Sequence, residues 1–172
     1  MTSNLNVLAQ ARWPEPDDRE VPPVPGFVLS SFNPMVAAVA DRCLRRHYRQ
    51  APAPDGEGGA TAVVLVSASG DMASASHVAR MVDAGGRPGP LFFYQSVPNS
   101  IVGLLAARWA LGGPVVCLCP TGDPMTDGLA EAALLIEDGD ADAALVMLVE
   151  QFGAEGESAA AAAVLVSGGA KQ

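Results

Sequence analysis

The sequence is poor in the side chains that most often perform catalysis or hold metal ions. Among its 172 residues are two histidines, His47 and His77, and three cysteines. Three cysteines cannot all pair with one another, so we expect reduced thiols and a cytoplasmic protein. Aromatic residues make up only 5% of the chain, and this scarcity predicts a core packed largely from small aliphatic side chains.

Basic residues are scarce as well. The chain has 10 Lys and Arg against 19 Asp and Glu, a formal net charge of -9. Binding of nucleic acid requires a basic face that neutralises phosphates, and binding of an anionic bilayer requires basic clusters. The sequence also has no apolar run of membrane-spanning length and no signal peptide at its start. We therefore expect partners that are neither nucleic acid nor membrane.

Hydrophobic residues, by contrast, make up 49% of the chain. A chain of this length and composition can bury a core as a single domain without disulfides or metals. Five prolines stand among the first 25 residues. This composition predicts a proline-rich N-terminal arm over residues 1–25, extended unless the domain body or a partner holds it. Residues 26–172 then form the folded domain.

Apolar runs alternate with helical patterns along this domain. Strands are predicted at residues 61–67, 115–119, 143–149 and 160–166, and the β-prone segment 26–31 adds a fifth. Helices are predicted from the Asn33-Pro34 cap to residue 50, and at residues 72–84, 99–111 and 126–138. The last two strands leave no room for a helix between them, so they should be antiparallel. The class is α/β, with a mixed, mostly parallel five-stranded sheet and helices on both faces.

Few residues suggest chemistry by themselves. Cys117 and Cys119 would face the same side of a strand, but no histidine or further cysteine lies near them in the sequence, so a metal site is not expected. His77 stands beside serines without a G-x-S-x-G motif, which argues against a serine triad. The segment 122–124 lacks the rest of a phosphate-binding loop. We expect neither a metal ion nor any other cofactor.

Residues 92–150 resemble the N-terminal half of β-ketoacyl synthases. In that family an N-x-x-A-G helix leads to G-L-x-G-P, then to a strand, to the nucleophilic cysteine at a helix N-terminus and to A-x-x-x-I-x-x-G-x-x-D. The matching positions, in one register without gaps, are Asn99, Gly103, Leu111, Gly113, Pro114, Gly139 and Asp142. The resemblance implies a thiolase-like layered fold, of which this chain is one half of the α-β-α-β-α arrangement.

The same register places the cysteine position of the family at Gly122, which has no nucleophile. The active-site histidines of the family belong to its C-terminal half, to which the resemblance does not extend in this chain. We therefore expect no decarboxylative condensation by this chain alone. A ketosynthase homologue without its cysteine resembles a chain-length factor of a type II polyketide synthase. Residues 26–44 and the motif SVPNS are similar to the ketosynthase-like subunits of highly reducing polyene pathways.

This resemblance implies a heterodimer with an active β-ketoacyl synthase subunit, to which an acyl carrier protein delivers malonyl units. In the family, the strand before the nucleophile pairs across the two-fold axis. The corresponding residues here are Pro114, Val115, Val116, Cys117, Leu118 and Cys119. A strand with no charged residue is suited to such pairing.

The resemblance also implies a tunnel for the growing acyl chain. Its wall or end would include Asp71, Met72, Phe93 and Gln95, although Met72, Phe92 and Phe93 fit ordinary core positions equally well. Two other functions stay open at this point. One is a small acyltransferase or thioesterase that uses Cys119 or a serine, and the other is a homodimeric thiolase-like scaffold without an acyl role.

Overall fold

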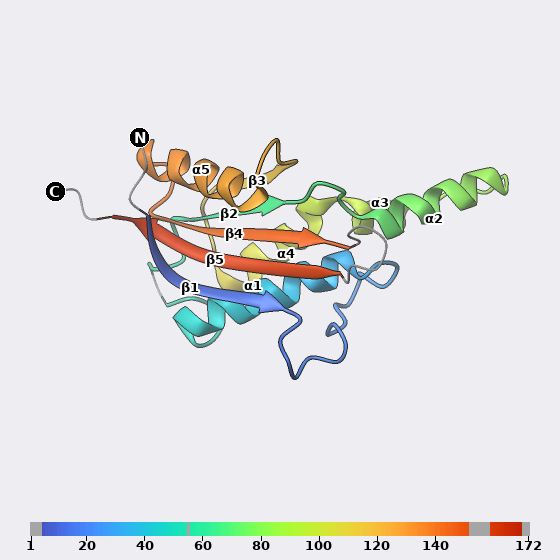
Figure 1. Ribbon diagram of the computed structural model, residues 1–172. Coiled ribbons are helices and arrows are strands. Elements are labelled where there is room, and N and C mark those ends of the chain that lie inside the picture. Colours follow the sequence, from blue (N-terminus) through green and yellow to red (C-terminus); the bar gives the residue numbers. More distant parts are fainter. Residues whose placement is uncertain (1–4, 55, 152–158, 170–172) are drawn as a thin grey trace.

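The computed structural model describes residues 5–54, 56–151 and 159–169. Ten elements follow one another along these residues (Figure 1): β1 (Leu5–Trp13), α1 (Phe32–Tyr48), β2 (Thr61–Val66), α2 (Met72–Asp83), α3 (Pro90–Ser96), α4 (Pro98–Trp109), β3 (Val115–Leu118), α5 (Pro124–Glu137), β4 (Ala143–Glu150) and β5 (Ala160–Gly168). None of the described helices is both long and apolar enough to cross a bilayer.

The strands form one five-stranded sheet in the order β1-β5-β4-β2-β3. Strand β2 is parallel to both β3 and β4, whereas β5 is antiparallel to β4 and to β1. Four of the five strands therefore run in one direction, and the predicted mixed, mostly parallel sheet is confirmed. Strands β1 and β3 form the two edges of the sheet.

The fifth strand is not the predicted segment 26–31 but β1, inside the predicted N-terminal arm. Residues 26–31 form no strand; only Val24 and Phe27 make an isolated bridge, around a turn in which Gly26 has a φ of 87°. The domain body holds residues 5–13 of the arm instead. Strand β1 pairs with β5 along its length, and Arg46 of α1 donates a hydrogen bond of 2.6 Å to the carbonyl of Gln10.

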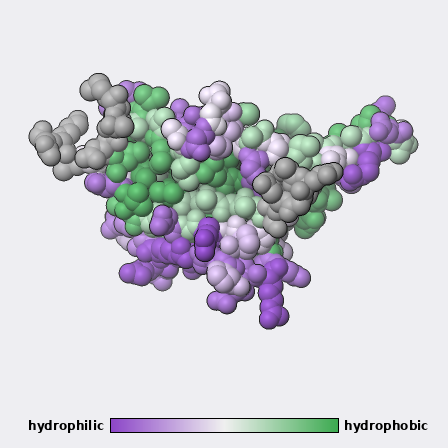
Figure 2. All heavy atoms as spheres, viewed as in Figure 1, coloured by the Kyte–Doolittle hydropathy of each residue, from purple (hydrophilic) through white to green (hydrophobic). Residues whose placement is uncertain are grey.

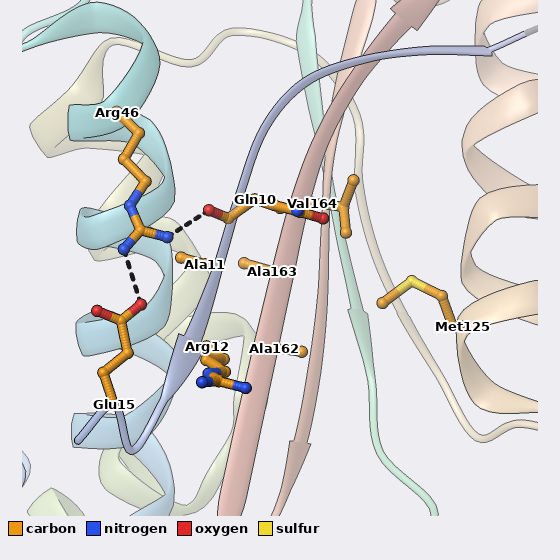
Figure 3. A pocket seen from close by; sticks show the side chains of 9 residues that line it. All are labelled: Gln10, Ala11, Arg12, Glu15, Arg46, Met125, Ala162, Ala163 and Val164. Atoms are coloured by element: carbon orange, nitrogen blue, oxygen red, sulfur yellow. Dashed lines mark hydrogen bonds and ion pairs between the residues drawn. The ribbon is translucent and has the colours of Figure 1, made fainter.

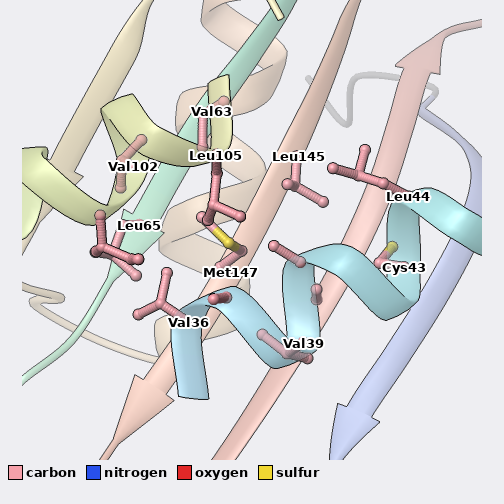
Figure 4. Packing of buried hydrophobic residues seen from close by; sticks show 14 of the residues in the cluster. Val36, Val39, Cys43, Leu44, Val63, Leu65, Val102, Leu105, Leu145 and Met147 are labelled. Atoms are coloured by element: carbon pink, nitrogen blue, oxygen red, sulfur yellow. The ribbon is translucent and has the colours of Figure 1, made fainter. Parts of the chain in front are cut away.

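Helices cover both faces of the sheet. On one face, α1 and α4 enclose a large apolar cluster with side chains such as Leu65 and Met147 of the central strands (Figure 4). On the other face, α5 packs closely on small residues, and Gly128 lies directly against Val66 and Val146. Because β2 is buried on both faces, it reads in the sequence as an unbroken apolar run.

The predicted helices are confirmed, with differences at their ends. Helix α1 begins at Phe32 with Ser31 as the N-cap residue, so Asn33 does not cap it. The Asn33 side chain is buried and donates a hydrogen bond of 2.7 Å to the carbonyl of Gln95 instead. Helix α3 was not predicted, because its seven residues are too few to show a clear period. The turn expected at residues 152–158 lies outside the described residues.

Cys43 lies on α1 and is fully buried, and burial raises the pKa of its thiol to about 11 from the ordinary value of 9.0. Since the folded pKa exceeds the unfolded one, the stabilisation present below pH 9 should be lost as the pH rises toward 11. The two-unit difference corresponds to a loss of up to about 3 kcal/mol. Urea unfolding at several pH values should show this loss in the wild type. A Cys43→Ala variant that loses as much stability over the same range would contradict this assignment.

Candidate functional site

The carboxyl ends of the parallel strands β2, β3 and β4 meet at one edge of the sheet, where open α/β sheets bind their ligands. The loop after β2 is tied to the end of β4. The carboxylate of Glu150 accepts hydrogen bonds from the backbone N–H of Ala68 and from the hydroxyl of Ser69. This tie gives the loop a defined shape beside the segment that follows β3.

That segment, residues 119–123, leads into α5 and contains Gly122. The carboxylate of Asp127 accepts hydrogen bonds from the N–H groups of Gly122 at 2.9 Å and Thr121 at 2.7 Å. These two bonds hold the pKa of Asp127 below its usual value. The N–H groups that could bind an anion at the start of α5 are therefore occupied by a carboxylate of the chain itself.

Asp123 completes the helix start as the N-cap of α5. Its carboxylate accepts hydrogen bonds from the hydroxyl and from the N–H of Thr126, at 2.6 and 2.9 Å. The bond from the hydroxyl is the main reason that the pKa of Asp123 is lowered, and the bond from the N–H adds to it. Two ionised carboxylates thus stand at the position where the family resemblance implies a nucleophile.

The backbone does not require glycine at residue 122. A Cβ added there would have Asp127 Oδ1 as its nearest neighbour, at 3.7 Å, and the residue is not in the left-handed region. Gly113 is different, because an added Cβ would lie 2.5 Å from the carbonyl carbon of Thr61. Position 122 has room for a side chain, including that of cysteine, but the sequence places none there.

The two cysteines near this edge differ in their surroundings. Although Cys117 lies on the exposed edge strand β3, its thiol is directed at Asn99 of α4 and donates a hydrogen bond of 3.1 Å to Oδ1. The Cys117 thiol is partly buried there, and burial raises its pKa. The Cys119 thiol is exposed and lies 3.8 Å from the carbonyl oxygen of Ala68. No contact joins either thiol to a histidine among residues 5–54, 56–151 and 159–169.

The buried serine of α2 is also not placed as a nucleophile. Ser74 is 3% exposed, and its hydroxyl donates a hydrogen bond of 2.7 Å to Asp71. The ring of His77, one turn further along α2, stacks on the ring of Phe92 with 5.2 Å between centroids. Within the described part of the chain, no three histidine, cysteine or acidic residues lie together in a way that could hold a metal ion.

The predicted tunnel residues lie in two groups. Asp71 caps α2 and also accepts a hydrogen bond of 2.6 Å from the hydroxyl of Ser30. Met72 follows it at the base of the same helix and is 41% exposed. Phe93 and Gln95 belong to α3. Phe93 is 74% exposed, so the alternative of an ordinary core position is wrong for Met72 and Phe93, and it is correct for Phe92. Their neighbour Phe92 is the buried aromatic residue of α3.

Gln95 connects α3 to the segment before α1. Its Oε1 accepts a hydrogen bond of 3.1 Å from the N–H of Val28. The structure thus brings Gln95 to the loop at residues 28–31 and brings Asp71 to the same loop through Ser30. The side chains of Asp71 and Gln95 both form hydrogen bonds within the chain. The side chains of Met72 and Phe93 are exposed and can contact another molecule.

Sequence reasoning missed a buried glutamine at this edge. Gln151, 1% exposed, accepts a hydrogen bond of 3.0 Å from the N–H of Ala73 and donates to the hydroxyls of Ser30 and Ser31. It therefore joins the end of β4, the base of α2 and the segment before α1. No local pattern predicts this role, because its partners lie far from it in the sequence.

Hollows in the described part of the chain include one beside the candidate site and one beside the edge strand β1. One, of about 180 Å³, lies at the carboxyl ends of β2 and β3; its lining is Phe32, Leu65, Ser67, Gly70, Pro98, Cys117 and Leu118. The other, of about 400 Å³, lies beside β1 (Figure 3). Its Arg46 guanidinium is paired with Glu15 at 2.7 Å, so this charge serves to hold β1 and the following turn to α1.

Comparison with known proteins identifies the family. A family model described as the β-ketoacyl synthase N-terminal domain matches residues 8–156. The chain belongs to this family. The match begins within β1 and continues through β4, and it includes Gly122 and Asp127. No curated protein sequence matches the chain.

Solved structures share the thiolase-like fold of this β-ketoacyl synthase domain. The ketosynthase ApeO in complex with its chain length factor ApeC, from Xenorhabdus doucetiae, matches with a TM-score of 0.72 and 20% identity, over 96% of this chain and 79% of that one. The ishigamide ketosynthase/chain length factor matches with a TM-score of 0.67 and 18% identity, over 84% and 45%. The AntDE:AntF complex of a type II polyketide synthase matches with a TM-score of 0.71 and 12% identity, over 96% and 62%.

Proposed function

We propose that this chain is a non-catalytic, chain-length-factor type subunit that pairs with an active β-ketoacyl synthase in type II polyketide biosynthesis, of the polyene kind. One observation carries the proposal. At Gly122, where the family register expects the nucleophile, there is no thiol, and Asp127 occupies the neighbouring N–H groups. A thioester formed there would need both a nucleophile and free donors for the oxyanion.

The edge strand β3 supports the pairing. None of its residues is charged, and Val115 is 42% exposed. An unprotected edge of this kind is suited to the addition of another strand. Two of the structural relatives are described as a ketosynthase with its chain length factor. In this proposal the edge residues 114–119 form the seam, and the acyl carrier protein docks on the ketosynthase subunit.

The proposed contribution of the chain to catalysis is a wall of the acyl-chain tunnel. Met72 and Phe93 are exposed and apolar, as a wall that faces a partner subunit requires. Asp71 and Gln95 hold the segments that carry these two side chains. The chain needs no cofactor for this role. An enzymatic role for Cys119 would need a base, and among the described residues the hydrogen-bond partners of its thiol are the carbonyl oxygens of Ala68 and Pro120.

Co-expression with an active β-ketoacyl synthase subunit of a type II polyketide synthase tests the proposal. We expect the two chains to co-purify as a heterodimer that extends acyl chains, while the isolated chain takes up no label from an acyl thioester probe. A stable monomer or a homodimer in the presence of the ketosynthase would overturn the proposal. Probe labelling of the wild type that disappears in Cys119→Ala, with Cys117→Ala as the matched control, would establish the acyltransferase alternative instead.

A further inference from the structure

Helix α2 (Met72–Asp83) projects from the domain and is supported only at its base. Figure 1 shows it extending beyond the end of the sheet, and Ser74, in its first turn, is its only buried residue. The base is well anchored, by the Asp71 cap and by Gln151, which accepts a hydrogen bond from the N–H of Ala73. A helix of 12 residues without packing is marginally stable in water. The remaining turns therefore need a surface to pack against.

One side of α2 is suited to such packing. Met72, Ala75, Ala79 and Val82 are all exposed, and their spacing of three, four and three residues places them on one face. This spacing is that of the narrow apolar seam through which two helices pack in coiled coils. We call these four residues the α2 stripe. The charged residues Arg80 and Asp83 lie outside the stripe, and both hydrophilic and hydrophobic side chains are visible on the projection in Figure 2.

Helix α2 is connected to the edge strand β3 through a series of contacting elements. The stacked rings of His77 and Phe92 join α2 to α3, and α3 exposes Leu91 and Phe93 to 78% and 74%. Helix α3 packs on α4, and α4 packs on β3. Each element of this series has at least one exposed apolar side chain, such as Val82 on α2, Leu104 on α4 and Val115 on β3.

We propose that the α2 stripe packs against an apolar helix of the ketosynthase-type subunit that pairs at β3; this inference rests on the proposed function. The area that a stable dimer needs favours this occupant. Standard interfaces bury about 800 Å² on each partner. Strand β3 has four residues, too few to supply that area. The stripe and α3 add exposed apolar area to that of β3. Because the stripe has no charged residue, it is suited to an apolar helix and not to an acidic or basic surface.

Hydrogen exchange on the co-purified heterodimer tests this inference. We expect the amides of α2 beyond its first turn to exchange at least tenfold more slowly in the complex than in the free chain. Ala79→Glu should weaken the affinity for the ketosynthase at least tenfold. The matched control is Arg80→Glu, which lies off the stripe and changes the charge by two units, and we expect its affinity to stay within threefold of the wild type. Circular dichroism of both variants checks that the sheet is intact.

Each contrary result has its own meaning. If the heterodimer forms but α2 exchanges as fast as in the free chain, or Ala79→Glu binds as well as Arg80→Glu, the inference about α2 is overturned while the proposed function stands. If no heterodimer forms with the wild type, the proposed function itself fails. If the isolated chain is a dimer that Ala79→Glu converts to a monomer, the stripe binds a second copy of this chain, and the inference is again overturned.

Discussion

A proline at residue 117 is expected to weaken pairing with a ketosynthase-type subunit by more than an order of magnitude. The carbonyls of Pro114 and Leu118 accept hydrogen bonds from Val63 and Ser67 of the β2 segment, at 2.8 and 3.2 Å. Since successive backbone groups of a strand point in opposite directions, the N–H groups of Val115 and Cys117 point to the free edge. Cys117→Pro removes the donor at the centre of this edge and leaves the bonds to β2 in place.

The expected loss of affinity is large. The missing hydrogen bond and the unpaired carbonyl that it leaves on the partner together cost about 2–4 kcal/mol, which is roughly thirty- to a thousandfold in Kd. Affinity for the ketosynthase can be measured by titration with a labelled chain. Cys117→Ala is the matched control, because it removes the same thiol but keeps the N–H group. Equal affinities of the two variants would show that β3 is not the pairing edge.

The second large effect is expected at Gly113, just before β3. An added Cβ would lie 2.5 Å from the carbonyl carbon of Thr61 and 2.6 Å from the nitrogen of Ala62. Both residues are fully buried at the start of β2, so the backbone there cannot move aside without disturbing the centre of the sheet. We expect Gly113→Ala to lower the free energy of unfolding by about 3 kcal/mol or more, at the upper end of overpacking effects.

Gly103→Ala is the matched control for this prediction. Gly103 lies inside α4 with no atom within 4 Å of an added Cβ, so alanine should stabilise the helix by about 0.5–1 kcal/mol. Urea unfolding of the two variants should therefore shift the midpoint in opposite directions. A Gly113→Ala variant as stable as the wild type would mean that the chain does not approach itself so closely at this point.

Both glycines carry the family resemblance in the sequence, and the sequence alone cannot distinguish them. The structure shows that Gly113 is required by a close approach of two backbones, whereas Gly103 is not. The same distinction applies at Gly122, where the backbone has room for a side chain. A glycine with no steric reason at the expected nucleophile position is consistent with a site that has no chemical task, and this is why Gly122 matters to the proposed function.

The sequence by itself determined those features that depend on local pattern. Unbroken apolar runs marked β2, β3, β4 and β5, and the short connection between the last two strands required them to be antiparallel. It also determined that no thiol stands at residue 122. Strand β1 was not predicted as a strand, because its nine residues mix polar and apolar side chains and it gains its place only by pairing with β5, more than 140 residues later.

Only the tertiary structure decided which side chains are engaged and which are free. Gln151 reaches Ser30 across 121 positions of sequence, and Asp127 fills the N–H groups of the loop that bears Gly122. The exposure of Met72 and Phe93 likewise follows from the way α2 and α3 leave the domain body. Periodicity acts between residues close in the chain, whereas these contacts depend on how distant segments pack. The sequence therefore shows that residue 122 is a glycine, and the fold shows which apolar side chains stay exposed.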